Sequence, residues 1–195
     1  MDSLAEKYYS ISPYVYCVNN PVKYIDPDER KVEFGPGTSD IYKKQFAVAV
    51  KYLNETNNGG MLKELQDSKN TYYIENGNTG SYNPITKTIQ WNPIEAIMTT
   101  NGYEMSPTEV LNHEIDHANQ NDKNPEKQNQ DKEPDGSSYV NKEEKRVITG
   151  SEQKTAKNMG KLKKGEVTRT DHEGTSYETI DSVSTVNIKE IIIRP

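Results

Sequence analysis

The residues with the clearest chemical potential are His113, Glu114 and His117, which form the pattern His-Glu-x-x-His. Residues four apart on a helix lie on one face about one turn from each other, so the two imidazoles can bind one metal ion. Zinc bound in this way lowers the pKa of a water ligand to about 7, and the neighbouring glutamate accepts its proton before the hydroxide attacks a carbonyl group. The chain contains only 3 histidines, and two of them lie in this pattern. The spacing therefore predicts a hydrolytic zinc site with Glu114 as the base.

The segment from Ser106 to Gln120 has the features of the helix that this pattern requires. Ser106 is a favourable N-cap, Pro107 suits the first helical position, and Glu109 completes a capping box. Asp116 is unusual, because an apolar residue often stands at this place in the pattern. We expect Asp116 to face solvent, with the alternative that it orients a ligand as an outer carboxylate. The apolar side of the helix is predicted from Val110, Leu111, Ile115 and Ala118.

A catalytic zinc ion needs a third protein ligand, and acidic residues downstream supply candidates. A helix is predicted to begin near Asn141, and on it Glu144 shares a face with Val147 and Ile148. This face places the carboxylate of Glu144 beside the buried side, so we predict Glu144 as the ligand. Glu143 is the close alternative ligand and Glu152 is a further candidate, although both are expected to lie on other parts of the surface.

The third histidine, His172, has two candidate roles besides that of a surface residue. One is that of the third zinc ligand, which would give an all-histidine site. The other is to donate a hydrogen bond to the oxyanion that forms during hydrolysis, a role for which Arg169 and Tyr177 are further candidates. We assign His172 to catalysis and keep the ligand role as the alternative.

The composition limits the classes of protein to which the chain can belong. The net charge of -6 and the pI near 5.2 argue against a nucleic-acid-binding protein, although a short basic stretch includes Lys161, Lys163, Lys164 and Arg169. We expect this stretch to be a solvated turn. The single cysteine, Cys17, excludes an internal disulfide, and no apolar run approaches the length of a membrane span. The polar N-terminus lacks a signal region, so the protein is expected to stay in the cytoplasm or to leave as part of a larger one.

The remaining sequence predicts a modest α+β domain. Helical periodicity is expected over Asp40 to Leu53, capped by Ser39 or Asp40, and in a short turn from Met61 to Leu65. The polar run from Asn119 to Ser138 is expected to be a mobile loop. The expected strands are Thr71 to Ile74, an antiparallel partner from Lys87 to Trp91, and a C-terminal strand from Thr185 to Ile193.

The first thirty residues differ from the rest and contain the run YYSISPYVYCVNNPVKYIDPD. This run resembles the end of the core domain of RHS-repeat proteins, where an SPY-Y-NNP-IDPDG motif precedes a variable C-terminal toxin. Glu29 stands where that family usually has glycine. The resemblance implies that residues 1–30 are the tail of an RHS core and that residues 31–195 are a toxin domain. It also implies secretion or delivery to a target cell as part of a larger protein.

The region from Tyr82 to Gly174 resembles the NleD-like effector metalloproteases, which are toxins of the zincin class. The shared order is YNPITKTIQWNP, the zinc helix LNHEIDHA, EEKRVITGSE and RTDHEG. The resemblance implies a zincin-like fold, in which a small antiparallel sheet packs on a metal-binding helix and a second ligand helix. It implies a zinc endopeptidase acting on a protein substrate, and as a toxin domain the chain is expected to have an immunity protein as partner. It supports His113, Glu114 and His117 firmly, and the Glu143/Glu144 pair more loosely.

Two other functions remain open from the sequence. One is a different zinc hydrolase, such as an amidase or peptidoglycan peptidase, that uses the same centre. The other is a metal-stabilised binding module without catalytic activity. Metal content and hydrolysis in a Glu114→Gln variant separate these hypotheses, because only an enzyme would keep zinc and lose activity.

Overall fold

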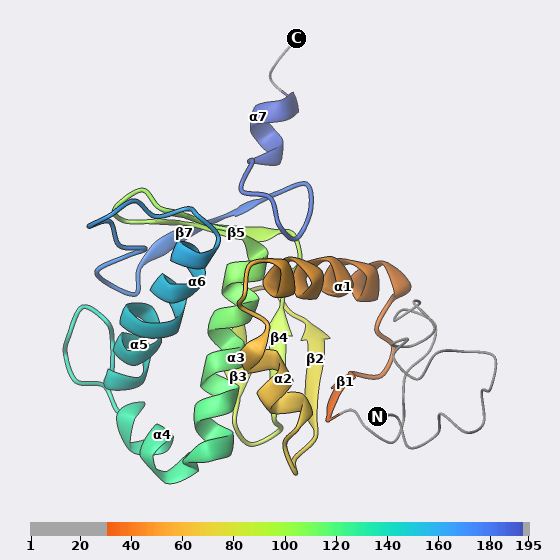
Figure 1. The fold of residues 1–195 in the computed structure, drawn as a ribbon, viewed down its shortest axis with the longest axis vertical. Helices are drawn as coiled ribbons and strands as arrows, with labels where there is room; N and C mark the ends of the chain where they lie inside the picture. The colour runs from red at the N-terminus through yellow and green to blue at the C-terminus, as the bar shows by residue number, and fades with distance from the viewer. Residues whose placement is uncertain (1–30, 193–195) are drawn as a thin grey trace.

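The structure is a computed structural model that describes residues 31–192, in which helices pack against two small sheets (Figure 1). The described chain confirms the α+β class. The proposed RHS segment 1–30, with Cys17, lies outside the described residues, as do residues 193–195. No helix between residues 31 and 192 is both long enough and apolar enough to cross a membrane.

The larger sheet has four strands in the order β1-β2-β4-β3. Its strands are β1 (Val32–Phe34), β2 (Tyr72–Asn76), β3 (Ser81–Asn83) and β4 (Thr88–Trp91). β2 pairs with β4 in parallel, with Ile74 opposite Ile89, so the expected antiparallel pairing of these two strands is wrong. The reason is the additional strand β3, which forms the antiparallel hairpin with β4 in place of β2. β3 and β1 are consequently the two edge strands of the sheet.

The core lies between this sheet and three helices, α1 (Asp40–Glu55), α2 (Gly60–Gln66) and α3 (Pro107–Lys123). The predicted helices at Asp40 to Leu53 and Met61 to Leu65 are confirmed, and Ser39 caps α1 by accepting a hydrogen bond from the amide of Tyr42. Trp91 on β4 is fully buried and donates its indole N–H to the carbonyl of Pro107 at 2.7 Å. This bond fixes the start of α3 against the sheet.

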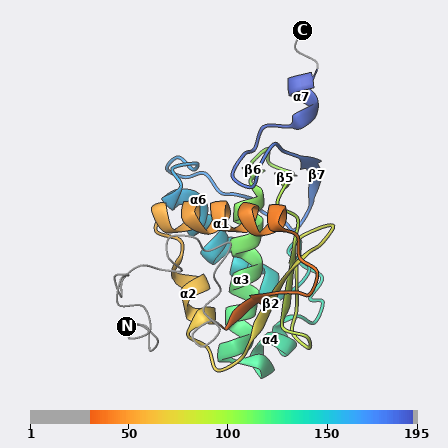
Figure 2. The same ribbon diagram turned by 90° about the vertical axis from the view of Figure 1, so that its right-hand side faces the viewer.

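The smaller sheet is antiparallel, in the order β6-β5-β7. It consists of β5 (Glu95–Thr99), β6 (Glu104–Met105) and β7 (Gly174–Glu178). The expected C-terminal strand is wrong, because a short helix, α7 (Ile188–Ile192), occupies most of that segment and projects from the body (Figure 2). The side chain of Asn187 accepts a hydrogen bond from the amide of Lys189, and this turn starts the helix instead of a strand.

A second group of helices packs along α3, on the side away from the larger sheet (Figure 1). It comprises α4 (Pro125–Asp131), α5 (Lys142–Val147), the π-helix η3 (Ile148–Glu152) and α6 (Gln153–Asn158). The mobile loop expected from Asn119 to Ser138 is therefore largely helical. Its physical anchor is Gln128, which is fully buried and donates its amide N–H to the carbonyl of His117 at 2.6 Å.

Candidate metal centre

The start of α3 is specified as the sequence predicts. Ser106 and Glu109 form both halves of a capping box, and Pro107 occupies the first turn. The carboxylate of Glu109 accepts hydrogen bonds from the backbone N–H and the hydroxyl of Ser106, each at 2.8 Å. The first of these contacts satisfies the backbone N–H of Ser106, which has no partner within the helix. They fix the register of α3, so that the imidazoles of His113 and His117 point to the same side, toward α5.

Three donor atoms converge between α3 and α5. The Nε2 atoms of His113 and His117 lie 3.1 Å apart. The carboxylate of Glu144 is 3.2 Å from the first of them and 3.3 Å from the second. His113, His117 and Glu144 thus form a group that could hold a metal ion, and the role of Glu144 as a ligand stays a prediction.

The spacing of these atoms fits a small tetrahedral ion. Ligand atoms that are each about 2.0–2.1 Å from a shared ion lie roughly 3.3 Å from one another at the tetrahedral angle. The two Nε2 atoms, and each Nε2 with its nearer Glu144 oxygen (Oε2 for His113, Oε1 for His117), are separated by distances within 0.2 Å of that value. Two imidazole nitrogens and one carboxylate oxygen are also the donor set of many catalytic zinc sites. The residues present therefore fit Zn²⁺.

The opposite nitrogen of each imidazole is held by its own glutamate. His113 Nδ1 lies 2.9 Å from Glu152, and His117 Nδ1 lies 2.9 Å from Glu143. An ionised carboxylate only accepts hydrogen bonds, so each Nδ1 carries a proton and donates it. In the neutral imidazole this leaves the Nε2 lone pair free to bind a metal, which is the usual outer arrangement of zinc-bound histidine.

Negative charge exceeds positive charge around the three donors. Without a cation, burial opposes ionisation of His113, but the hydrogen bonds that its ring donates to Glu144 and Glu152 outweigh burial and raise its pKa to about 10. Burial likewise opposes ionisation of His117, yet Glu143 and Glu144 raise its pKa above the ordinary value. A divalent cation would replace these protons as the source of positive charge. The charged groups are the carboxylates of Glu114, Asp116, Glu143, Glu144 and Glu152, set against the guanidinium groups of Arg146 and Arg169.

The ligand helix departs from a regular α-helix at the site. The Asn141 side chain caps α5 by accepting the amide N–H of Glu144 at 2.8 Å. Residues eight apart on a regular α-helix differ by about 80° in direction, so Glu152 would point well to one side of Glu144. The wider turn of η3 absorbs the excess rotation and brings both carboxylates to His113. The regular spacing used for the sequence prediction could not reveal this turn.

The expectation that Glu143 and Glu152 lie on other parts of the surface is therefore wrong. Their relative exposures are 0% and 3%. Glu152 also accepts hydrogen bonds from Thr168 at 2.6 Å and from Arg169 at 2.7 Å. Although burial raises the pKa of each carboxyl, hydrogen bonds from histidine and arginine lower both values to about 2. Both glutamates thus act as buried, ionised braces for the histidines.

Asp116 was expected to face solvent, and this is also wrong. It is 7% exposed, and its carboxylate accepts a hydrogen bond from Arg146 NH1 at 2.9 Å. Its second oxygen accepts the hydroxyl of Ser151. A carboxylate inside the helix–helix contact needs such partners, because an unpaired buried charge is strongly destabilising. The alternative expectation, that of an outer carboxylate, matches this geometry.

Glu114 lies beside the histidines and against the edge of the larger sheet. It is 7% exposed, and its negative charge acts on both imidazoles. Gly80, just before β3, approaches so closely that a Cβ there would lie 3.3 Å from Glu114 Oε1 and 2.4 Å from Val110 Cγ1. The glycine thus makes room for the carboxylate that the sequence assigns as the base.

His172 lies at the open side of the site, with its side chain 42% exposed. Its Nε2 is 3.2 Å from Glu144 Oε2, and its amide donates to the carbonyl of Ser138 at 3.0 Å. The other two candidate oxyanion donors are engaged elsewhere. Arg169 is buried against Glu152, and Tyr177 donates its hydroxyl to the carbonyl of Thr185 at 2.9 Å. Arg169 NH2 lies 3.5 Å from His113 Nδ1, so both it and His172 are close to the candidate ligands, but of the two only His172 is exposed.

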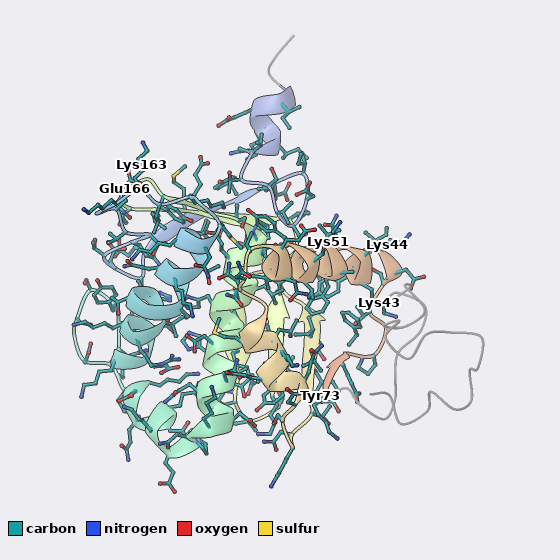
Figure 3. All side chains as sticks on the ribbon, in the orientation of Figure 1. Lys43, Lys44, Lys51, Tyr73, Lys163 and Glu166 are labelled. Atoms are coloured by element: carbon teal, nitrogen blue, oxygen red, sulfur yellow. The ribbon has the colours of Figure 1, made fainter. Side chains whose placement is uncertain are left out.

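The basic stretch does not form a single surface. Lys163 lies near Glu166 on the outer loop between α6 and β7, where the Glu166 carboxylate accepts the backbone amide of Lys163 at 2.8 Å (Figure 3). Arg169 instead turns inward and is 5% exposed. Lys163 and Lys164 are exposed, as expected from the sequence. The expectation of a solvated turn is wrong for Arg169 and for Lys161, which pairs with the buried carboxylate of Glu109.

Comparison with known proteins gives no further guide to the site. No family model, curated protein or solved structure matches this chain. The chemistry of the site must be inferred from its own residues.

Proposed function

We propose that this chain is a zinc-dependent endopeptidase that hydrolyses peptide bonds of a protein substrate. The observation that carries the proposal is the convergence of His113, His117 and Glu144, whose donor atoms are 3.1–3.3 Å apart, next to the carboxylate of Glu114. A bound Zn²⁺ supplies a Lewis acid and a water whose pKa is about 7.

The side chains of the chain itself have separate roles in this proposal. The two imidazoles and Glu144 hold the ion, while Glu143 and Glu152 keep the Nδ1 proton of each imidazole in place. Glu114 accepts a proton from the attacking water at its carboxylate and later passes it to the leaving amine. His172, half-exposed beside Glu144, donates a hydrogen bond to the oxyanion of the substrate.

The proposed biological setting rests on the first thirty residues. Their SPY, NNP and IDPD elements support an origin as the C-terminal toxin of an RHS-type protein. In that setting the chain is secreted or delivered to a target cell, and an immunity protein protects the producing cell. The acidic net charge of -6 supports a protein rather than a nucleic acid as the substrate.

The proposal is tested by comparing the wild-type chain with Glu114→Gln. Both proteins should bind one zinc ion, measured by elemental analysis after gel filtration. Only the wild-type chain should create new peptide termini when cell lysates are mapped by proteomics. Equal termini from both proteins would refute the role of Glu114. Zinc binding without new termini would favour an amidase acting on peptidoglycan, or a binding module, and a muropeptide digest separates these two outcomes.

A further inference from the structure

The carboxylate of Asp116 is joined to the ligand helix rather than to solvent. Its Oδ1 accepts a hydrogen bond from Arg146 NH1 at 2.9 Å across the contact between α3 and α5. The side chain of Asp116 is only 10% exposed, whereas that of Arg146 is 33% exposed. Water therefore reaches the guanidinium, and the aspartate is the group that holds it against the site.

The same guanidinium holds the glutamate that braces His117. Arg146 Nε donates to Glu143 Oε2 at 2.9 Å, and its NH2 donates to Glu143 Oε1 at 2.8 Å. Glu143 Oε1 in turn accepts the Nδ1 proton of His117 at 2.9 Å. The Nε and NH2 groups of Arg146 thus donate to Glu143, and its NH1 group donates to Asp116.

We propose that Asp116 is a positioning residue of the metal centre, which sets the orientation of His117 through Arg146 and Glu143. The chain of contacts starts and ends on α3 at neighbouring residues, so it forms a closed ring across the two helices. Without Asp116, the partly exposed guanidinium is free to turn toward water, and Glu143 loses the partner that fixes its bidentate geometry. His117 then loses a fixed ring orientation. This inference rests on the metal-binding part of the proposed function.

Two neighbouring contacts lie outside this chain of contacts. Asp116 also accepts the hydroxyl of Ser151, which ties it to η3 without involving Glu143. His113 is braced by a separate pair, Glu152 and Arg169, in which Asp116 takes no part. A change in Asp116 should therefore disturb His117, while the brace of His113 remains.

The experiment measures binding of Co²⁺ and Zn²⁺ to the full chain by competition with a chelator, together with the visible spectrum of the Co²⁺ form. Asp116→Asn should weaken metal affinity about 10-fold, the lower end of the effect of outer-shell substitutions, and change the Co²⁺ absorption bands. Glu64→Gln is the matched control, because it makes the same acid-to-amide change in a surface pair with Lys123, and it should leave both unchanged. In an Arg146→Gln background, Asp116→Asn should change the affinity less than about twofold, because sites that act through a shared partner are not additive.

Several results decide the inference. Wild-type affinity and an unaltered Co²⁺ spectrum in Asp116→Asn would overturn it, and so would an undiminished effect in the Arg146→Gln background. If Asp116→Asn does not fold, Arg146→Lys supplies the test, because it keeps the charge but loses the forked contact, and an unaltered Co²⁺ spectrum there would also overturn the inference. Failure of the wild-type chain to bind either ion would instead refute the metal-binding proposal itself, and with it this role of Asp116.

Discussion

His113 and His117 turn one nitrogen toward each other at 3.1 Å and give the other nitrogen to separate glutamates, Glu152 and Glu143. Two lone pairs at this distance repel unless a proton or a cation lies between them. The arrangement explains why the surrounding carboxylates are so numerous, because they favour positive charge at this point. The same relationship gives predictions about metal binding and pH.

Replacing a ligand should differ from replacing the histidine at the mouth of the site. His113→Ala removes one of the three donors and should abolish stoichiometric zinc binding and all hydrolysis. The variant should still fold, because Glu152 keeps Arg169 as a hydrogen-bond partner. His172→Ala should keep zinc and lose about 100-fold in kcat, the scale of a lost oxyanion donor. Elemental analysis and peptidase assays check both variants. Loss of zinc in His172→Ala would return His172 to the ligand role.

The metal-free protein should lose stability as the pH rises. The pKa of His113 is raised from 6.5 to about 10 by Glu144 and Glu152, which outweigh burial. Between these pH values the folded chain binds a proton that the unfolded chain has released. The contribution of His113 to the free energy of unfolding is therefore fully present below about pH 6.5 and is lost as the pH rises toward 10. Urea unfolding with a chelator present, at pH 6, 8 and 10, measures this trend. His113→Gln removes the titrating group, and an equally steep decline in that variant would contradict the assignment.

Gly80 should control the base without affecting the metal. Gly80→Ala places a Cβ 2.4 Å from Val110 and 3.3 Å from the Glu114 carboxylate, so both side chains must shift. Misplacing a catalytic group by about 1 Å can cost about 100-fold in rate, so a shift of Glu114 by a few tenths of an ångström should lower kcat by about 3- to 10-fold with zinc retained. Gly60→Ala is the matched control, because its Cβ meets nothing within 4 Å. Equal activity in the two variants would show that Glu114 tolerates the displacement.

Asp122 should matter for stability alone. Its Oδ1 accepts hydrogen bonds from Ser68, Asn70 and Tyr72 at 2.7–2.8 Å, and these tie the end of α3 to β2 and the loop before it. Asp122→Ala leaves the buried hydroxyl of Tyr72 without this acceptor and should lower the free energy of unfolding by about 2–3 kcal/mol. Chemical denaturation measures the change, and zinc affinity should remain that of the wild type. Asp131→Ala, which breaks a surface pair with Lys127, should cost less than about 1 kcal/mol.

The sequence predicts the part of the site that depends on local rules. The capping box at Ser106, the two histidines one turn apart and the face of Glu144 all follow from helical periodicity and N-terminal chemistry. These features involve residues close in sequence, where spacing determines direction. The N-cap at Asn141, where the ligand helix was expected to begin, belongs to the same class.

The errors concern partners that are distant in the chain. From its spacing Asp116 is predicted to be a surface residue, because the sequence does not show that Arg146 lies opposite it. Glu152 is predicted to face away from Glu144, because the sequence does not show the π-helix between them. The direction of β4 depends on β3, a strand of only three residues whose signal is too short to detect. The polar segment that includes α4 is anchored by the buried hydrogen bond that Gln128 donates to the carbonyl of His117. No spacing rule within the sequence encodes these contacts.

The wide turn at Ile148–Glu152 changes how spacing along the chain translates into direction. A π-helical turn holds about one residue more than an α-helical turn. Glu152, eight positions after Glu144, therefore takes about the direction of a residue seven positions on in a regular helix. One continuous stretch of helix can in this way present two carboxylates to the same imidazole ring, that of His113.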